Sequence, residues 1–311
     1  MTNIYYLLGI NYNKNEIEKI IYSKLWFTYR SYFPNIEGTY LTNDIGWGCT
    51  IRSGQMLIGN TIIRKNLGLN WKYEKTTISN EYHKIINKFQ DNYDGEFSLH
   101  NILKYYKIFE HEPGDWIGPY SFCKILEKME KNLMGSQIKY YNFINAELDI
   151  KSIEEQDENI SYLLTFPVRL GIKEISSKYY DNILYLTKNK YFNGIIGGNN
   201  KASYYFIGSN DNNKLIYLDP HIVNRYNIEE SIEDEYHTKE INELDISLLS
   251  PTFSISFYFE SYKEISDMRE ILDNITDKYY PIISIYSRES KEYQSYTIKE
   301  DDEQWEFIDD I

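Results

Sequence analysis

Cys49 is the residue whose type and position most directly suggest chemistry. It stands between a glycine turn and the expected start of a helix, in the stretch NDIGWGCTIRSGQM. A helix N-terminus presents unpaired backbone N–H groups and a partial positive charge, which favour a thiolate and can stabilise an oxyanion. Gly46 and Gly48 permit a tight turn and leave room for a peptide backbone beside the thiol. The alternative is packing, because a free cysteine usually behaves as a small buried hydrophobe.

A cysteine nucleophile needs a base, and His221 is the best candidate among the five histidines. It ends the run KLIYLDPH, and Asp219 lies two residues earlier, so both side chains point to the same face of an extended chain. The carboxylate can then bind one imidazole nitrogen and leave the other free to face a thiol. The alternative is a plain turn after a strand. The remaining histidines are expected in solvated positions: His83, His100, His111 and His237.

The elements that must position these residues form a helical first part and a β-rich second part. Helices are predicted at 15–32, at 50–65 and within 70–135, and later at 173–184 and in SYKEISDMREIL. β-rich runs are YYLLG, QIKYYNFI, ISYLLTFPV, the hairpin SYYFIGSNDNNKLIYLDPH, TFSISFYFE and YYPIISIY. This order predicts an α+β fold, an antiparallel sheet packed with helices. A cysteine at a helix start and a histidine at a strand end are the two halves of a papain-like site.

Composition limits the classes of partner. The 311 residues include 33 basic and 47 acidic side chains, a formal charge of −14 that argues against nucleic acid or anionic lipid as the main partner. A basic protein partner fits this charge better. Two cysteines cannot form a disulfide framework, no signal segment is visible, and no apolar run approaches the roughly 20 residues of a membrane span. We therefore expect a cytoplasmic protein, and we expect it to be a monomer.

Seven motifs, in order and approximate spacing, resemble those of the autophagins, the autophagy cysteine proteases. They are WFTYRSYFPNIEGT, DIGWGCTIRSGQM, GDWIGP, FPVRLG, IIGG, SYYFIG and LIYLDPH. The resemblance implies a papain-like fold with a small auxiliary subdomain, in a catalytic domain over residues 1–294. It implies no metal and no cofactor. The implied reaction is cleavage of a ubiquitin-like autophagy modifier of the GABARAP type after its C-terminal glycine, and release of that modifier from phosphatidylethanolamine.

The same resemblance assigns roles to individual residues. It makes Cys49 the nucleophile, His221 the base and then the acid, and Asp219 the group that orients the imidazole. Tyr29, in FTYR, matches a tyrosine whose hydroxyl lines the oxyanion hole, whereas spacing alone would nominate Asn43. Three further positions match substrate-binding features: the cleft-roofing Trp116, the modifier-contacting Arg169, and a covering loop formed by Asn199, Asn200, Lys201 and Ala202.

Two positions depart from the family pattern. Asn200 replaces the expected loop proline, so the loop should be less rigid and its autoinhibition is in doubt, although Gly197 and Gly198 can still serve as a hinge. Ser53 stands where some members carry a second cysteine, so a local thiol switch is absent.

The acidic C-terminal stretch, residues 295–311, is expected to be a flexible tail. Trp305 and Ile308 form an aromatic-x-x-aliphatic pattern preceded by acids, which resembles the motif by which autophagy proteins bind these modifiers. In an extended tail, the two side chains would enter apolar pockets beside the modifier's sheet. The precursor and the lipid-conjugated modifier are the expected partners, and membrane contact is expected only through the lipidated form.

Two alternatives remain open at this point. One is a catalytically weak scaffold that binds the modifier, and the other is a papain-fold thiol enzyme acting on another ubiquitin-like protein. An intact set of Cys, His and Asp argues against the scaffold, which has no chemical need for it.

Overall fold

The structure is a computed structural model that describes residues 4–199, 202–226, 233–276 and 280–286. The expected tail, with Trp305 and Ile308, lies outside these ranges, as do Asn200 and Lys201. No helix within the described ranges is long and apolar enough to cross a bilayer.

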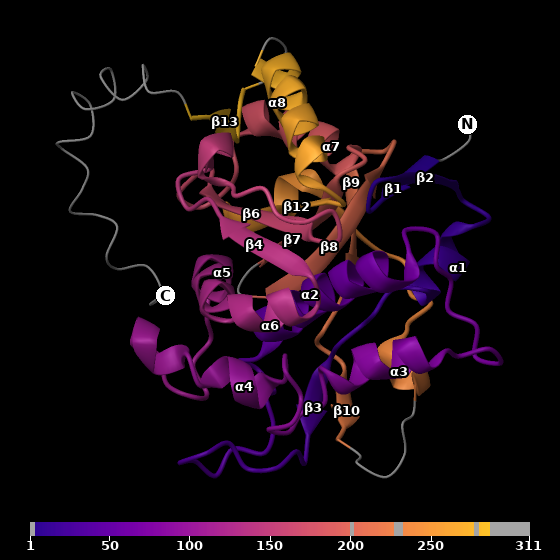
Figure 1. Ribbon diagram of the computed structural model, residues 1–311, viewed down its shortest axis with the longest axis vertical. Coiled ribbons are helices and arrows are strands. Elements are labelled where there is room, and N and C mark those ends of the chain that lie inside the picture. The colour runs from indigo at the N-terminus through magenta and orange to yellow at the C-terminus, as the bar shows by residue number, and fades with distance from the viewer. Residues whose placement is uncertain (1–3, 200–201, 227–232, 277–279, 287–311) are drawn as a thin grey trace.

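A nine-stranded sheet forms the middle layer of the molecule (Figure 1). Its strands are β1 (Ile4–Leu7), β2 (Ile10–Asn13), β4 (Ile138–Asn142), β6 (Ser161–Arg169), β7 (Phe192–Asn199), β8 (Ala202–Asn210), β9 (Lys214–Leu218), β11 (Asn242–Asp245) and β12 (Thr252–Phe259). The main path runs β11-β9-β8-β7-β12-β6-β4, and β1 joins β2 to β8. The pairings are antiparallel except for β4 with β6, so the predicted sheet is confirmed with one parallel pair.

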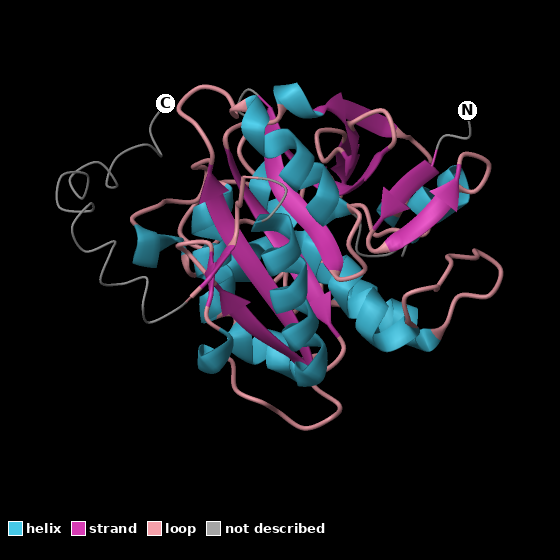
Figure 2. Ribbon diagram, turned by 90° about the horizontal axis from the view of Figure 1, so that it is seen from above, coloured by secondary structure: helices cyan, strands magenta, loops and turns pink. Residues whose placement is uncertain are grey.

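Helices cover both faces of this sheet, which confirms the predicted α+β class. Helices α2 (Cys49–Leu67) and α5 (Pro119–Lys128) pack on one face, and α7 (Tyr180–Thr187) and α8 (Tyr262–Thr276) pack on the other (Figures 1 and 2). The remaining helices are α1 (Ile17–Tyr22), α3 (Asn80–Asn87), α4 (Leu99–Leu103) and α6 (Glu130–Gly135), with short 3-10 turns at Tyr106–Phe109, Ile150–Ser152, Ser177–Tyr179, Glu233–Tyr236 and Ile246–Leu248.

Helix α2 is the most buried helix of the described chain, because it runs between the sheet and the other helices. Its residues from Cys49 to Ile63 are all buried. A helix that is enclosed on every side belongs to the interior of a domain rather than to its surface. The predicted helix at 50–65 is confirmed, and the packing around it fixes the position of its first turn.

Two small sheets lie apart from the main one. Strand β3 (Tyr29–Ser31) pairs in parallel with β10 (Val223–Arg225), and these two strands lie side by side below the main sheet in Figure 1. Strand β5 (Glu147–Leu148) pairs in parallel with β13 (Ser284–Ile285). Of the run YYPIISIY, the described residues 280–286 form a strand only at 284 and 285.

The predicted helix at 15–32 is wrong beyond Tyr22, where α1 ends. Leu25 and Tyr29 continue the helical spacing of apolar residues, but their backbones bond elsewhere. The Leu25 N–H donates to Asn60 Oδ1 at 3.0 Å, and the Tyr29 N–H donates to the Pro220 carbonyl at 2.9 Å. These tertiary partners replace the helical hydrogen bonds and place Tyr29 on a strand.

Candidate active site

Cys49 is the first residue of α2, and its side chain is 1% exposed. Gly48 occupies the N-cap, where no side chain accepts a hydrogen bond from the helix. The N-terminal N–H groups are therefore not blocked by a capping side chain, and the partial positive charge of the helix end lies beside the sulfur. The structure thus places the cysteine where the sequence predicted it.

The two glycines before Cys49 serve different purposes. Gly46 has φ +85°, and no heavy atom lies within 4 Å of where its Cβ would be. It is needed for its left-handed backbone and leaves open space, as predicted. A Cβ on Gly48 would instead lie 2.3 Å from a carboxylate oxygen of Asp44. Gly48 therefore makes room for a buried carboxylate, a role that the sequence did not suggest.

The pairing of β3 with β10 brings the other candidate residues to this helix end. Tyr29 lies opposite Val223 in the parallel register, and the Tyr29 N–H bonds to the Pro220 carbonyl. The Trp26 indole N–H donates to the Asp219 carbonyl at 2.6 Å. The segment that contains the Asp-Pro-His motif is thus fixed along its backbone by residues from the start of the chain.

Asp219 and His221 form a directly bonded pair. His221 Nδ1 lies 2.6 Å from Asp219 Oδ1, and the His221 backbone N–H donates to the same oxygen at 2.9 Å. His221 also lies beside the Cys49 sulfur, and each of the two groups shifts the pKa of the other. Because Nδ1 is used by the carboxylate, Nε2 is the nitrogen left to face the sulfur, which is the order of contacts in a Cys-His-Asp triad.

The pKa values of the pair are shifted towards a thiolate and an imidazolium. Burial alone would raise the pKa of the Cys49 thiol, but the His221 imidazole, the Ser203 N–H and the Trp116 indole N–H together outweigh burial and lower it. Burial alone would lower the pKa of His221, but Asp219 and then Cys49 raise it to about 9. Near neutral pH the imidazole is therefore a proton donor, and the sulfur ionises more readily than that of an ordinary cysteine.

Aromatic side chains surround the sulfur and the imidazole. The Trp116 indole N–H donates to Cys49 Sγ at 3.2 Å. Burial, followed by the nearby Cys49 sulfur, raises the pKa of the Tyr29 hydroxyl. The rings of Tyr29 and Tyr204 meet the His221 ring edge-on, with centroids 5.3 Å and 5.4 Å away. Tyr204 and the Ser203 N–H are parts of the site that the motifs did not single out, although both lie in SYYFIG.

A family of known proteins matches most of this chain. The family described as peptidase C54 catalytic domain matches residues 14–271. The chain belongs to the peptidase C54 family. The match confirms the predicted autophagin family, its papain-like fold class and the class of cysteine peptidase.

Named relatives of this peptidase C54 chain are cysteine proteases. It is 33% identical over 301 residues to "Cysteine protease ATG4" of Candida albicans, covering 90% of this chain and 64% of that protein. It is 28% identical to human "Cysteine protease ATG4C", covering 93% of this chain and 79% of that protein. It is 29% identical to "Cysteine protease ATG4A" of Xenopus laevis, covering 86% of this chain and 77% of that protein.

The peptidase C54 site favours Tyr29 over Asn43 as the side-chain partner of the nucleophile. The Asn43 amide oxygen accepts the backbone N–H of Ile45 at 3.3 Å and so closes a local turn. Tyr29 contacts both the sulfur and the His221 ring. The spacing argument for Asn43 therefore identifies a turn residue.

Other predicted positions of the peptidase C54 chain lie at strand ends. Arg169 is the exposed last residue of β6, and its Nε donates to the Gly171 carbonyl at 3.2 Å. Asn199 ends β7 and Ala202 begins β8, where the two residues pair. Asn199 and Ala202 thus flank the predicted covering loop, immediately before Ser203. Ser53 is buried one turn after Cys49, and its hydroxyl accepts a hydrogen bond from Ser203 Oγ at 3.4 Å.

The expectation that four histidines are solvated is wrong for two of them. His100 is buried, and its Nε2 lies 2.6 Å from the Pro34 carbonyl. His237 is buried, stacked on Tyr73, with Nε2 2.6 Å from the Tyr82 hydroxyl. Their polar sequence neighbours concealed this, because tertiary aromatic contacts decide the burial. His83 and His111 are partly exposed.

The second cysteine has a different environment. Cys123 is buried on α5, and its sulfur donates to Ser254 Oγ at 3.2 Å. Burial raises the pKa of the Cys123 thiol to about 11. It is therefore an unreactive packing cysteine at neutral pH. Within the described ranges, no group of three or more His, Cys, Asp or Glu side chains could hold a metal ion.

Proposed function

We propose that this peptidase cleaves a ubiquitin-like autophagy modifier of the GABARAP type after its C-terminal glycine, with Cys49 as nucleophile, His221 as acid and base, and Asp219 as the orienting carboxylate. The observation that carries the proposal is the position of the hydrogen-bonded pair Asp219 and His221 beside Cys49 at the N-terminus of α2. The named relatives are called cysteine proteases, which supports the same chemistry.

In the first step, the Cys49 thiolate attacks the carbonyl carbon of the terminal glycine. The oxyanion that forms accepts hydrogen bonds from the Cys49 N–H and the Tyr29 hydroxyl. The His221 imidazolium gives its proton to the departing amine, and the C–N bond breaks. A thioester between Cys49 and the modifier remains.

In the second step, water hydrolyses this thioester. The neutral His221 left by the first step takes a proton from the water, whose oxygen attacks the same carbonyl. The C–S bond then breaks, and the Cys49 thiolate and the His221 imidazolium are restored. Asp219 keeps the imidazole in one tautomer and orientation through both steps.

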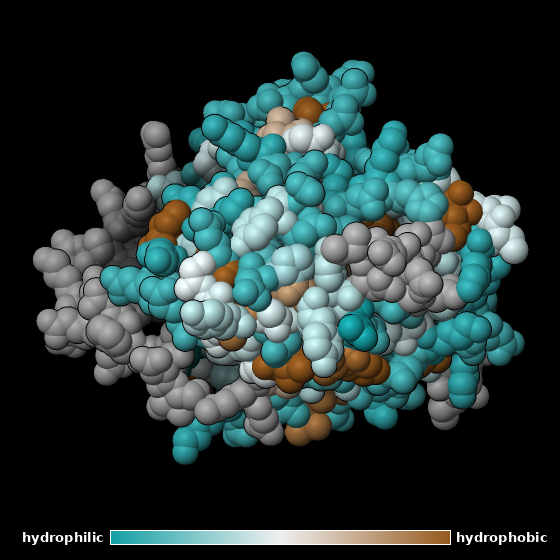
Figure 3. Space-filling view, turned by 90° about the horizontal axis from the view of Figure 1, so that it is seen from below, coloured by the Kyte–Doolittle hydropathy of each residue, from teal (hydrophilic) through white to brown (hydrophobic). Residues whose placement is uncertain are grey.

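A glycine-ended protein chain fits the surroundings of the sulfur. Trp116 lies against Cys49, and the open space at Gly46 accepts backbone without side chains. Exposed apolar residues lie on the same segments that carry the catalytic groups; they are Tyr32, Ile45, Ile222 and Val223, and we call them the apolar rim. Figure 3 shows a mostly hydrophilic face with a compact hydrophobic band. An apolar rim of this kind suits a protein substrate better than a small molecule.

Lipid-conjugated modifier is the second proposed substrate, since its glycine is joined to the amine of phosphatidylethanolamine and the same steps release it. We propose that the enzyme is a cytoplasmic monomer. It then contacts the membrane only through the lipid-conjugated modifier. Arg169 and the loop at 199–202, with Asn200 and Lys201 at its centre, are proposed contacts of the modifier.

The main experiment follows truncation of the modifier precursor by mass spectrometry, with the parent protein and Cys49→Ala. The proposal expects cleavage after the glycine by the parent and none by the variant. Cleavage by Cys49→Ala at the parental rate would show that another group is the nucleophile. Cleavage by the parent of a different ubiquitin-like precursor, with the autophagy modifier left intact, would favour the alternative thiol enzyme.

A second arm uses modifier conjugated to phosphatidylethanolamine in vesicles. Release of the modifier by the parent and not by Cys49→Ala supports deconjugation. Binding to the vesicles without release would favour the catalytically weak scaffold.

The tail is tested separately. We propose that Trp305 and Ile308 bind the modifier as an extended segment. Trp305→Ala combined with Ile308→Ala should weaken modifier binding in calorimetry and leave the alkylation rate of Cys49 unchanged. Unchanged affinity and turnover would exclude the tail as a binding element.

A further inference from the structure

Asp44 lies at the junction of the three segments that carry the candidate active site. It belongs to the turn before Cys49, and its side chain is fully buried, at 0% exposed. Its carbonyl accepts the Gly48 N–H at 2.9 Å and the Trp47 N–H at 3.3 Å, so its backbone closes the turn that leads to the cysteine. The position of Asp44 thus sets the position of the residue that follows the turn.

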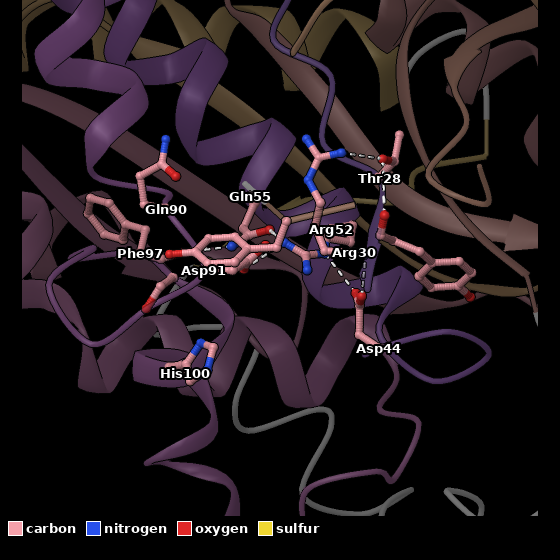
Figure 4. Close-up of polar contacts among 12 residues, drawn as sticks. Thr28, Arg30, Asp44, Arg52, Gln55, Gln90, Asp91, Phe97 and His100 are labelled. Atoms are coloured by element: carbon pink, nitrogen blue, oxygen red, sulfur yellow. Dashed lines mark hydrogen bonds and ion pairs between the residues drawn. The ribbon is translucent and has the colours of Figure 1, made fainter. Parts of the chain in front are cut away.

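The Asp44 carboxylate bonds to two different elements with its two oxygens. Oδ1 accepts the backbone N–H of Arg30 at 2.7 Å, and Arg30 directly follows Tyr29 on β3. Oδ2 accepts Nε of Arg52 at 2.7 Å, and Arg52 lies one turn into α2 from Cys49. One side chain therefore connects the strand of the tyrosine to the helix of the cysteine (Figure 4).

Arg52 is in turn fixed by other buried groups. Its Nη1 donates to Asp91 Oδ1 at 2.9 Å and to Gln55 Oε1 at 3.0 Å. Gln55 Nε2 donates to the Phe97 carbonyl at 2.8 Å. Asp91 and Phe97 belong to the connection between α3 and α4, so the network joins three parts of the chain around one guanidinium (Figure 4).

Burying such a charged network costs free energy, so its presence needs an explanation other than stability. Burial raises the pKa of Asp44 against the opposing attraction of Arg52. One guanidinium and two carboxylates are taken from water where an apolar core could have been built, and ion pairs of this kind add little net stability. Their value lies in fixing a particular arrangement of the segments that they join.

We propose that Asp44 is a positioning residue for the catalytic cysteine, clamping the turn before Cys49, the first turn of α2 and the strand of Tyr29 in one arrangement through its bonds to Arg52 and the Arg30 N–H. This rests on the proposed role of Cys49 as nucleophile. Without the clamp, the sulfur moves relative to His221, Trp116 and the Ser203 N–H, the donors that stabilise its thiolate.

The test replaces Asp44 with asparagine. An amide retains an acceptor for the Arg30 N–H but turns its NH₂ group towards Nε of Arg52, so that two donors meet and the clamp opens. The matched control is Asp91→Asn, which removes a carboxylate from the same arginine, is similarly buried at 4% exposed, and does not touch the turn before Cys49. Both variants are compared with the parent in thermal unfolding.

The first measurement is the rate of alkylation of Cys49 by iodoacetamide as a function of pH, followed on its peptide by mass spectrometry. It needs no substrate, and Cys123 serves as the unreactive internal reference. The clamp predicts that Asp44→Asn slows alkylation at pH 7 about tenfold, which corresponds to a rise of about one unit in the pKa of the thiol. Asp91→Asn should remain within about threefold of the parent.

The sign of this change separates positioning from simple electrostatics. If Asp44 acted only as a nearby negative charge, its removal would favour the thiolate and alkylation would become faster. If Asp44 only stabilised the fold, Asp44→Asn and Asp91→Asn variants with the same fall in Tm would show the same fall in alkylation rate. Faster or unchanged alkylation in Asp44→Asn, or equal slowing in both variants, overturns the proposal.

The second measurement is cleavage of the modifier precursor. Displacement of a nucleophile by about 1 Å costs on the order of 10²-fold in rate, so Asp44→Asn should lower kcat by about that factor and change KM little. Failure of Cys49→Ala to abolish cleavage would reject the proposed function, whereas the alkylation series tests the clamp without a substrate.

Gly48→Ala keeps every charge and provides a second route if Asp44→Asn does not fold. Its Cβ would lie 2.3 Å from Asp44 Oδ2, so the carboxylate must shift. The variant should slow alkylation as Asp44→Asn does. Parental alkylation by a folded Gly48→Ala would reject the clamp.

Discussion

Replacing Tyr29 with phenylalanine would remove one hydroxyl from the candidate active site and leave the ring in place. The ring is buried and meets the His221 ring edge-on at 5.3 Å, so its packing survives the change. The lost group is the donor that contacts Cys49 and that we place at the oxyanion. The substitution therefore separates hydrogen bonding from packing at this position.

The expected fall in kcat follows from the number of hydrogen-bond donors to the oxyanion. Loss of one oxyanion donor in a protease costs about 10²–10³ in kcat, or about 2.7–4 kcal/mol. The Cys49 N–H remains at the helix N-terminus after the change. We therefore expect the lower end for Tyr29→Phe, a fall of about 10² in kcat with KM nearly unchanged, because the donor acts in the transition state.

The assay is steady-state cleavage of the modifier precursor, with Asn43→Ala as the matched control for the competing oxyanion candidate. The Asn43 amide closes a local turn, so its loss should lower Tm slightly and leave kcat within about threefold. A kcat for Tyr29→Phe within threefold of the parent would refute the role of the hydroxyl. A hundredfold fall in Asn43→Ala instead would return the oxyanion role to the amide.

Three further outcomes are expected. The cleavage rate should rise with pH as the Cys49 thiol ionises and fall as His221 loses its proton near pH 9. Asp219→Asn should move the alkaline limb of this profile to lower pH. Asp219 is the main group that raises the pKa of His221 against the effect of burial. An alkaline limb unmoved in that variant would contradict the triad. Trp116→Phe should move the iodoacetamide profile of Cys49 to higher pH, since an N–H donor to the sulfur is lost; an unchanged profile would show that this contact is incidental. Gly46→Ala should lower the free energy of unfolding by about 1–2 kcal/mol and Tm by a few degrees, because alanine is strained at a φ of +85°. No neighbouring atom would clash with the added Cβ, so backbone strain is the whole expected effect. An unchanged Tm would mean that the turn adapts.

The chemistry-bearing residues could be predicted from the sequence because their signals are local. A cysteine after a glycine turn at a helix start, and an aspartate two residues before a histidine at a strand end, define their own geometry over a few residues. The start of α2 and the end of β9 lie where those patterns place them. Motif order added Tyr29 and Trp116, which spacing alone would not have selected.

The segment 23–32 could not be predicted in this way, because its structure depends on distant partners. Its apolar residues continue the helical spacing of α1, yet Asn60 and Pro220 take up its backbone groups. Helical periodicity reports which side chains are buried and does not report where the backbone hydrogen bonds go. The buried histidines were missed because their side-chain partners are also distant in the sequence, Pro34 for His100 and Tyr73 and Tyr82 for His237.

The Asp44 network left one local signal that could have been used. Arg52 is the only charged residue between Cys49 and Ile63, the part of α2 that precedes its basic last turn. A single guanidinium in such a stretch must either reach solvent or meet a carboxylate. The sequence offers many carboxylates, and only the folded chain shows that Asp44 and Asp91 are the partners.

The parallel pairing of β3 with β10 has a consequence for biosynthesis. Chains are made at about 5–20 residues per second, so on the order of ten to thirty seconds separate the emergence of the cysteine from that of its histidine. Throughout this interval the thiol has no imidazole beside it, and β3 has no β10 to pair with. A ribosome-bound fragment that ends before Asp219 therefore carries the nucleophile without its base. Maturation of the enzyme coincides with the joining of these two distant strands.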